Sequence, residues 1–379
     1  MKRLLTIGHS YVVAANRRLA HHMAIEGRSE WEVTALAPER YRGDLRTIDV
    51  EPIAGEACSL VAVPVRLDCQ VHLMTYAGRA RELLADRWDV VHLWEEPFTR
   101  SAAHVARTIG TSARLVVASF QNITKTYPWP LRAYERETMQ RAGGWIAFGE
   151  TVHQALSERP GYSGKPSRVI PPGVDLERFR PDPAARQAIR DRLGWPAGAV
   201  VVGYLGRFVE EKGIDTLTGA LAGPLRAGSC HAVFVGGGDL EAELRRLAAR
   251  APGRVHVQTD VPHDEVPQWL PAMDILCAPS QSTPRWREQF GRMLIEAMAC
   301  GVAVIASDCG EMPFVVGDAG VIVSETDEIG WREAIERLVG DAARRRQLVE
   351  RGLARVHDRF TWPLVARQHL AFFDEVLRG

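Results

Sequence analysis

The segment Gly206–Gly213 places two cations directly after an apolar run that predicts a strand. Arg207 and Lys212 lie in this segment. Only four of the 47 basic residues are lysine, so a lysine inside a motif is rarely an accident of composition. Loops that leave the carboxyl ends of parallel strands are where open α/β sheets bind ligands. A planar guanidinium and an ammonium suit a diphosphate, although a solvated loop with an arginine–glutamate pair is the simpler interpretation.

A second segment predicts a helix whose start suits an anion. Residues 292–300 favour a helix, and Gly301 is a suitable stop. Phe290 and Gly291 come just before this helix, where free backbone amides and the helix dipole attract a phosphate. The sequence therefore offers a second place for the phosphates of a ligand.

Two glutamates flank that helix start. Glu288 and Glu296 are eight positions apart, and a helix that included both would separate them by about 12 Å. Carboxyl pairs that cut one glycosidic bond lie about 5–9.5 Å apart, so this pair is a poor candidate for a hydrolase. The two carboxylates suit hydroxyls at the two ends of an elongated ligand such as a nucleotide sugar. Without the first motif, two exposed helix carboxylates would be the favoured interpretation.

Short apolar runs supply the elements that must position these residues. Six runs rich in Val, Ile and Leu occur in each half of the chain, with room for a crossover helix between them. The alternation predicts two parallel α/β sheets, and continuous apolar runs favour strands buried on both faces. The runs cover residues 4–8, 33–38, 60–65, 90–94, 115–120 and 145–148, then 200–205, 232–235, 255–257, 275–278, 302–306 and 321–323.

Pro171, Pro172 and Gly173 separate the two halves. Two prolines suppress a helix and the glycine permits unusual backbone dihedrals, so we predict an interdomain linker here. The amphipathic pattern of residues 362–377 predicts a terminal helix that must pack against another surface. We therefore expect one domain over residues 1–170 and a second over residues 171–361.

The composition excludes several classes of protein. The chain has 379 residues, which favours two domains, and its 47 basic and 47 acidic residues balance. That balance argues against a nucleic-acid-binding protein that works through bulk charge. Apolar residues make up 46% and charged residues 25%, as in an ordinary globular protein. No signal-peptide or membrane-spanning pattern occurs and the six cysteines are scattered, so we expect a cytoplasmic enzyme with reduced thiols.

The two motifs together resemble the donor site of glycosyltransferase family 4, whose members are retaining enzymes with the GT-B fold. The family carries a Gly-Arg…Lys-Gly loop and two glutamates separated by seven residues, and both are present here. Residues 169–175, Val-Ile-Pro-Pro-Gly-Val-Asp, resemble the domain junction of that family. The resemblance implies two Rossmann-like domains with parallel sheets facing a central cleft. The first would bind the acceptor and the second the donor, and the C-terminal helix, residues 362–379, would cross back to the N-terminal domain.

The resemblance also implies a role for each motif residue. Arg207 and Lys212 would bind the donor diphosphate and stabilise the leaving group. Glu288 would bind sugar hydroxyls, Glu296 the ribose hydroxyls, and the loop around Val261 would lie near the base. The residues expected to contact the donor are Arg207, Lys212, Val261, Glu288, Phe290, Gly291, Leu294 and Glu296, and those expected to take part in catalysis are Arg207, Lys212 and Glu288.

The first half departs from the family pattern on the acceptor side. The family often has a histidine at the end of a later strand, where this chain has Gln121 and Asn122. These amides can hydrogen-bond a hydroxyl but cannot take a proton as an imidazole can. His9 and His92 follow or end other predicted strands, and either is a candidate to replace the missing histidine or is purely structural.

These features predict that a sugar moves, with retention of configuration, from a UDP- or GDP-linked donor to an acceptor hydroxyl. The acceptor class stays open between a glycan, a lipid-linked molecule and a small molecule. No metal is expected, because the chain has no Asp-x-Asp triplet, and no cofactor or nucleic acid is implied. Arginines of a predicted helix over residues 132–141 leave open a weak peripheral contact at the inner membrane face. Two alternatives remain, namely a nucleotide-sugar epimerase of similar fold and a non-catalytic nucleotide-sugar-binding protein.

Overall fold

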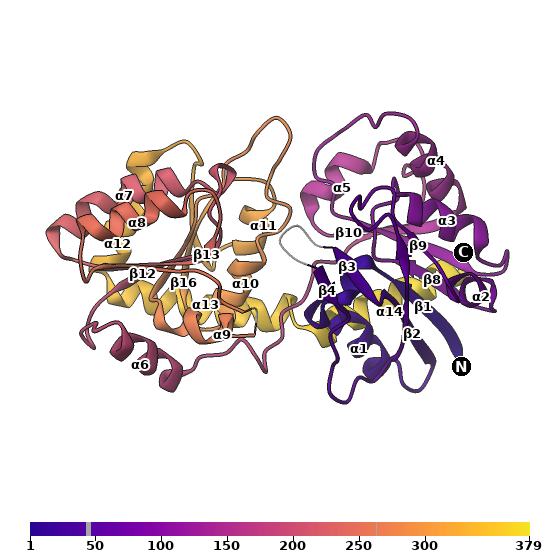
Figure 1. Ribbon diagram of the computed structural model, residues 1–379, viewed down its shortest axis with the longest axis horizontal. Coiled ribbons are helices and arrows are strands. Elements are labelled where there is room, and N and C mark those ends of the chain that lie inside the picture. Colours follow the sequence, from indigo (N-terminus) through magenta and orange to yellow (C-terminus); the bar gives the residue numbers. More distant parts are fainter. Residues whose placement is uncertain (43–46, 263) are drawn as a thin grey trace. The chain divides into compact units, whose positions relative to one another are not determined.

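The computed structural model describes residues 1–42, 47–262 and 264–379 (Figure 1). The chain divides into two compact units. Unit 1 comprises Met1–Gly173 together with Trp362–Gly379, and unit 2 comprises Val174–Thr361. The division therefore falls directly after the Pro-Pro-Gly segment and directly before the terminal helix.

Unit 1 is built on a parallel sheet. Its strands are β1 (Lys2–Ile7), β2 (Trp31–Pro38), β5 (Ser59–Val63), β8 (Val90–Leu93), β9 (Arg114–Ser119), β10 (Ala142–Ala147) and β11 (Ser167–Val169). Their order in the sheet is β11-β10-β9-β8-β1-β2-β5. The chain order reverses between β8 and β1, because β1 pairs with β2 on one side and with β8 on the other. All four residues of β8 are buried, as expected for a central strand that helices cover on both faces.

Two groups of helices cover the faces of this sheet (Figure 1). One face packs against α1 (Ala14–Glu26) and the terminal helix α14 (Trp362–Arg378), which contact each other. The other face packs against α2 (Ala80–Ala85), α3 (Arg100–Thr108), α4 (Leu131–Arg141) and α5 (Glu150–Leu156). The amphipathic helix expected at the end of the chain is confirmed as α14, which buries Trp362, Phe372 and Phe373.

Two short antiparallel hairpins accompany the unit 1 sheet. In one, β3 (Arg40–Arg42) pairs with β4 (Thr47–Asp49), and in the other, β6 (Val65–Arg66) pairs with β7 (Thr75–Tyr76). Pairs of two or three residues leave no apolar run in the sequence, so the sequence pattern did not predict them.

Unit 2 is built on a second parallel sheet, with the order β14-β13-β12-β15-β16-β17. Its strands are β12 (Val201–Arg207), β13 (His231–Gly237), β14 (Val255–Gln258), β15 (Ile275–Ala278), β16 (Ala303–Ser307) and β17 (Gly320–Val323). The helices over the described residues are α6 (Pro183–Arg192), η2 (Glu210–Lys212, 3₁₀), α7 (Ile214–Ala227), α8 (Glu241–Arg250), α9 (Val266–Trp269), η3 (Leu270–Ala272, 3₁₀), α10 (Arg292–Ala299), α11 (Met312–Val316), α12 (Glu328–Gly340) and α13 (Ala342–Arg359). One face of the sheet packs mainly against α7 and α12, and the other packs against α6 and α10 (Figure 1).

The predicted fold class is confirmed. Each run predicted as a strand overlaps a strand of one of the two parallel sheets. The prediction of six strands for the first sheet was one short among the described residues, because β11 was missed. β11 is three residues long and includes Ser167 and the exposed Arg168, so it lacks the apolar run that reveals the other strands.

Candidate active site

The switch point of the unit 2 sheet lies between β12 and β15. The chain order reverses there, because β12 pairs with β13 on one side and with β15 on the other. Such a reversal leaves a ligand-binding crevice at the carboxyl ends of the two strands. β12 ends at Arg207, and the loop after β15 carries Glu288. Both sequence motifs therefore lead away from the same switch point.

Gly213 lets the loop after β12 lie against the loop after β15. Its backbone is left-handed, with φ of 67°, and a Cβ at this position would lie 1.9 Å from the carbonyl oxygen of Pro279. Any other residue would add both strain and a clash. η2 therefore ends beside the end of β15, and Lys212 is its last residue.

Lys212 and Glu288 form a mostly buried ion pair. The Lys212 Nζ lies 2.5 Å from the Glu288 Oε2, and the two side chains are 12% and 10% exposed. The Ser280 hydroxyl donates to the same carboxylate oxygen over 3.1 Å. The ammonium also lies 4.6 Å from the centre of the Trp286 ring, within range of a cation–π attraction. The two motifs, far apart in the sequence, thus meet through one hydrogen-bonded charge pair.

The backbone of Glu288 is fixed by the loop after β16. Its N–H donates to the Cys309 Sγ over 3.4 Å, and its carbonyl accepts from the Glu311 N–H over 3.1 Å. Gly310 makes this approach feasible, because a Cβ there would lie 2.1 Å from the Glu288 carbonyl oxygen. Three loops at the carboxyl edge of the sheet therefore position one carboxylate.

Arg207 presents its side chain to solvent at the end of β12. The side chain is 54% exposed, and its guanidinium lies 3.5 Å from the Glu211 carboxylate, which is the arginine–glutamate contact of the simpler interpretation. The buried Tyr204 hydroxyl donates to the Arg207 carbonyl over 2.7 Å. Burial raises the pKa of Tyr204, the Glu288 carboxylate raises it further, and the Arg207 guanidinium lowers it. These charges therefore act on one phenol at the switch point.

The helix expected after Gly291 is confirmed as α10. Gly291 is its N-cap residue, and its left-handed φ of 80° favours glycine. The preceding Phe290 is buried in the core of unit 2, and so is Leu294, whose backbone N–H donates to the Gly291 carbonyl over 2.9 Å. Val261 is partly buried against the same core, next to Asp260 with its left-handed φ of 57°. Donor contacts by these residues stay predictions.

Glu296 lies within α10, whereas Glu288 lies outside it. The helix begins at Arg292, so the 12 Å separation expected for one continuous helix does not apply. The interpretation of two exposed helix carboxylates is also wrong, since the residues are 8% and 9% exposed. Burial raises the pKa of Glu296, and the charges of Arg292 and Arg178 oppose that rise. Within the described residues, no side chain hydrogen-bonds its carboxylate.

A histidine–glutamate pair occupies the switch point of the unit 1 sheet. His9 follows β1 and Glu95 follows β8, the two strands between which the chain order reverses. The His9 backbone N–H donates to Glu95 Oε1 over 2.8 Å, and its Nδ1 lies 3.5 Å from the same oxygen. Tyr76 and Ser101 donate their hydroxyls to this carboxylate. Burial would raise the pKa of Glu95, but the hydrogen bond and charge of His9, with Ser101 and Tyr76, hold it below its usual value.

His92 and His9 differ in exposure. The His92 side chain is completely buried, with its ring packed near Trp94, His369 and Phe373. Burial, with the neighbouring His369, holds the pKa of His92 well below its usual value. The His9 side chain is 28% exposed. Of the two histidines, His9 is therefore the one that a ligand in solution can reach.

Sequence reasoning missed several residues that surround the motif side chains. Ser280, Trp286 and Cys309 contact Lys212 or Glu288, and Glu95 holds His9. The adjacent glutamates after β8 were a usable signal, because paired acids directly after a buried strand lie at the ligand-binding edge of a parallel sheet. Ser280 and Cys309 gave no such signal, because their roles depend on contacts between distant loops.

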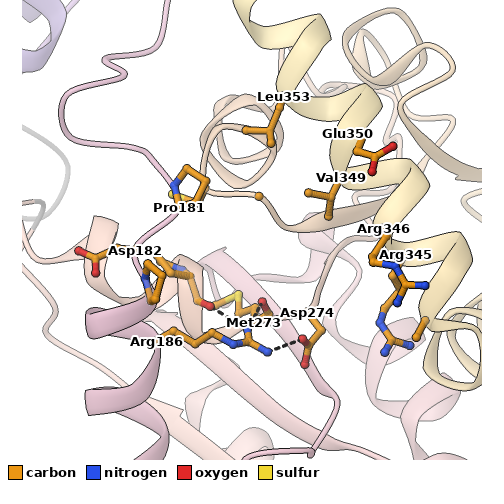
Figure 2. Close-up of a pocket in the computed structure, with 15 residues that line it drawn as sticks. Pro181, Asp182, Arg186, Met273, Asp274, Arg345, Arg346, Val349, Glu350 and Leu353 are labelled. Atoms are coloured by element: carbon orange, nitrogen blue, oxygen red, sulfur yellow. Dashed lines mark hydrogen bonds and ion pairs between the residues drawn. The ribbon is translucent and has the colours of Figure 1, made fainter.

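A cavity of about 470 Å³ lies at the opposite edge of the unit 2 sheet (Figure 2). Met273 and Asp274 precede β15, and Gly301 precedes β16, so these lining residues mark the amino ends of the strands. Figure 2 shows the Arg186 guanidinium directed at Asp274, to which it is bonded over 2.6 Å. The lining includes none of the predicted site residues.

The remaining expectations concern a metal, a membrane contact and the cellular location. The described residues contain no group of three His, Cys, Asp or Glu residues that could hold a metal ion. Over the same residues, no helix has the length and apolar character needed to span a membrane. In α4, the Arg141 guanidinium donates to the carbonyls of Gly110 and Ala113, each over 2.8 Å, and so is not free for a lipid headgroup. The cytoplasmic location stays a prediction.

Comparison with known proteins places both units in one group of enzymes. Residues 14–178 match the family described as Glycosyltransferase Family 4, and residues 199–341 match Glycosyl transferases group 1. A D-inositol 3-phosphate glycosyltransferase of Jonesia denitrificans is 30% identical over 315 residues, which cover 79% of this chain and 69% of that protein. Another, of Xylanimonas cellulosilytica, is 27% identical over 359 residues, with coverage of 89% and 81%.

Solved structures support the same fold. Anabaena Alr3699/HepE in complex with UDP has a TM-score of 0.73 at 19% identity, over 99% of this chain and 100% of that one. Sucrose-phosphate synthase from Thermosynechococcus elongatus has a TM-score of 0.73 at 22% identity, over 100% of both chains. The two α/β units and the sequence matches agree with the resemblance drawn from the motifs. The chain belongs to glycosyltransferase family 4 and is a glycosyltransferase.

Proposed function

We propose that the enzyme transfers a sugar from a nucleoside diphosphate sugar to an acceptor hydroxyl with retention of configuration. The observation that carries this proposal is the buried Lys212–Glu288 pair at the unit 2 switch point. An ammonium has three N–H donors. Lys212 can therefore keep its bond to Glu288 and still donate to a diphosphate. Glu288 retains acceptor capacity for sugar hydroxyls.

The proposed reaction separates charge across one bond. The bond between the anomeric carbon and the diphosphate oxygen breaks, and negative charge develops on the departing diphosphate. Arg207, Lys212 and the positive end of the α10 dipole stabilise that charge. The acceptor oxygen bonds to the anomeric carbon on the face that the diphosphate leaves, and the acceptor proton passes to the diphosphate. Glu296 holds the ribose hydroxyls of the nucleotide.

The acceptor side of the reaction is assigned to unit 1. His9 lies at the switch point of its sheet, and Glu95 fixes the position of His9 through a backbone hydrogen bond. We assign His9, rather than the buried His92, the role of hydrogen-bonding the acceptor hydroxyl. Relatives of this chain are named for D-inositol 3-phosphate, so this molecule is the first acceptor to assay.

Replacing His9 by alanine is expected to lower kcat/KM for the acceptor by about 10–100-fold, the usual effect of losing one hydrogen bond to a positioned group. Nucleotide affinity should not change, because His9 belongs to unit 1 and the proposed donor residues belong to unit 2. Steady-state transfer kinetics and nucleotide titrations separate the two effects. The matched control is His357→Ala, an exposed histidine on α13. Unchanged acceptor kinetics in His9→Ala would exclude this role.

Calorimetric titration with UDP and with GDP tests the donor assignment. We expect micromolar binding of one nucleotide and weaker binding in variants of Lys212 and Glu296. Incubation with the matching nucleotide sugar should release the nucleoside diphosphate, with the sugar transferred or slowly hydrolysed. An epimerised donor would instead support the epimerase, and tight binding without consumption under any acceptor would support a binding protein. If neither nucleotide binds, the proposed donor class is wrong.

A further inference from the structure

A cavity of about 400 Å³ lies in unit 1. Neither His9 nor Glu95 lines it, but its lining residue Tyr76 is hydrogen-bonded to Glu95. It is formed by the β6–β7 hairpin, the first turn of α2 and one face of α3. Its lining residues are Arg66, Thr75, Tyr76, Ala77, Gly78, Arg81, Arg100, His104 and Arg107. We call this set the basic pocket. Its volume lies within the range of small-molecule sites, about 300–1,000 Å³.

The charge of the basic pocket is concentrated and largely uncompensated. Four guanidiniums and one imidazole line it, with no carboxylate among the lining residues. Arg107 pairs with Glu137. In the part of the chain that the structure describes, no acidic side chain pairs with Arg66, Arg81 or Arg100. In a chain whose formal net charge is zero, this imbalance is local rather than a consequence of composition.

The helix α3 aligns three of these groups. Arg100, His104 and Arg107 follow the spacing i, i+4 and i+7, so they share one face of the helix. Burial lowers the pKa of His104, and the charges of Arg107, Arg100 and Arg81 lower it further. Those three guanidiniums therefore lie close enough to act on one imidazole. Like charges held this close repel each other unless an anion lies between them.

We propose that the basic pocket binds a phosphate group of a small ligand or a lipid headgroup. A phosphate monoester offers three oxygens and close to two negative charges, so several guanidiniums can share it in forked hydrogen bonds. A carboxylate offers two oxygens and one charge, and matches a single guanidinium better. The Thr75 side chain lines the same pocket and adds a hydroxyl donor of the kind that phosphates use.

Tyr76 connects the basic pocket to the proposed acceptor side. It lines the pocket, and its hydroxyl donates to Glu95, the carboxylate that holds His9. Two side chains, Tyr76 and Glu95, therefore connect a phosphate in the pocket to the histidine at the unit 1 switch point. The proposal itself depends on the pocket alone and not on the donor residues of unit 2.

Titration with inorganic phosphate and with glycerol 3-phosphate tests the pocket, on wild type and on Arg81→Gln/Arg100→Gln. We expect saturable binding to wild type and a loss of affinity of at least about tenfold in the double variant, because hydrogen bonds to a charged group are among the strong ones. Two controls locate the binding. Arg79→Gln removes an exposed arginine two positions from Arg81 that does not line the pocket, and Arg207→Gln alters the proposed donor loop.

The source of the phosphate is resolved by vesicles that contain phosphatidic acid or phosphatidylglycerol. Binding of the free phosphates supports a soluble ligand, whereas binding that needs phosphatidic acid and is lost in the double variant supports a headgroup. Equal binding to both kinds of vesicle, or equal weakening by Arg79→Gln, would reduce the pocket to bulk charge and overturn the proposal. If only Arg207→Gln lost phosphate binding, the phosphate site would lie in the donor loop and the proposal would be wrong. An absence of binding to every probe would also overturn the proposal.

Discussion

Replacing Lys212 by methionine is expected to lower donor turnover by about 10²–10³-fold, the usual effect of removing one preorganised charge from a developing anion. The Lys212 side chain is only 12% exposed, and Glu288 and the Trp286 ring fix its ammonium. It therefore needs little reorganisation when the diphosphate departs. Release of nucleoside diphosphate from saturating donor measures the effect. Lys2→Met is the matched control, because Lys2 lies in unit 1 and pairs near the surface with Asp374.

The same substitution also affects stability, and the two effects must be separated. Lys212→Met leaves the buried Glu288 carboxylate without its ammonium, and breaking a buried pair in this way costs about 3–5 kcal/mol. The double variant Lys212→Met/Glu288→Gln removes both charges and should recover most of the lost free energy of unfolding. We expect it to stay as slow as the single variant. A folded variant without Lys212 that turns over at the wild-type rate would remove this residue from the mechanism.

The sequence could predict the elements that long apolar runs define. The strands that flank both switch points, β1, β8, β12 and β15, are central in their sheets. Their buried residues form mainly apolar runs, which only single polar residues such as Thr6 and His92 interrupt. α10 was predicted because Gly291 and Gly301 bracket a helical segment, and both glycines have a left-handed φ. The β6–β7 hairpin was not predicted, although it forms one wall of the basic pocket.

The sequence could predict which residue types form the candidate site, but not which of their side chains contact each other. The motifs named Lys212 and Glu288 as partners of one ligand, but their direct ion pair depends on the adjacency of β12 and β15. Strand order is a tertiary property, and no local pattern in either motif specifies it. The same reason explains Glu95, since its contact with His9 requires that β8 lie beside β1. Residue types thus indicated the chemistry, and sheet topology determined which side chains meet.

Burial of the Glu296 carboxyl should lower the stability of the ligand-free protein, whereas the carboxylate should strengthen nucleotide binding. Replacing Glu296 by glutamine is expected to raise the free energy of unfolding of the ligand-free protein near neutral pH. Burial raises the pKa of this carboxyl in the folded state, against the opposing charges of Arg292 and Arg178. The folded protein therefore binds this proton more tightly than the unfolded chain, and ionisation at neutral pH costs stability.

The sign of the pH dependence follows from that shift. The carboxyl destabilises the fold as the pH rises above its unfolded pKa, near 4.5. The advantage of Glu296→Gln should therefore grow as the pH rises above the unfolded pKa and vanish below it, as urea unfolding of both proteins across this range can measure. Glu333→Gln, an exposed glutamate on α12, should show no such trend. A variant that is less stable than wild type at neutral pH would contradict the argument.

Glu296→Gln should weaken nucleotide binding, although it should stabilise the ligand-free protein. Two ribose hydroxyls would donate to the Glu296 carboxylate, and a hydrogen bond to a charged group contributes about 1.5–3 kcal/mol. Glu296→Gln should therefore raise the Kd for the nucleotide by about 10–100-fold. Because these hydroxyls favour the ionised carboxyl, wild-type affinity should rise with pH while the variant stays flat. Calorimetry at several pH values measures both trends. Equal affinity in the two proteins would mean that the ribose lies elsewhere, and the burial of this carboxyl would then need another cause.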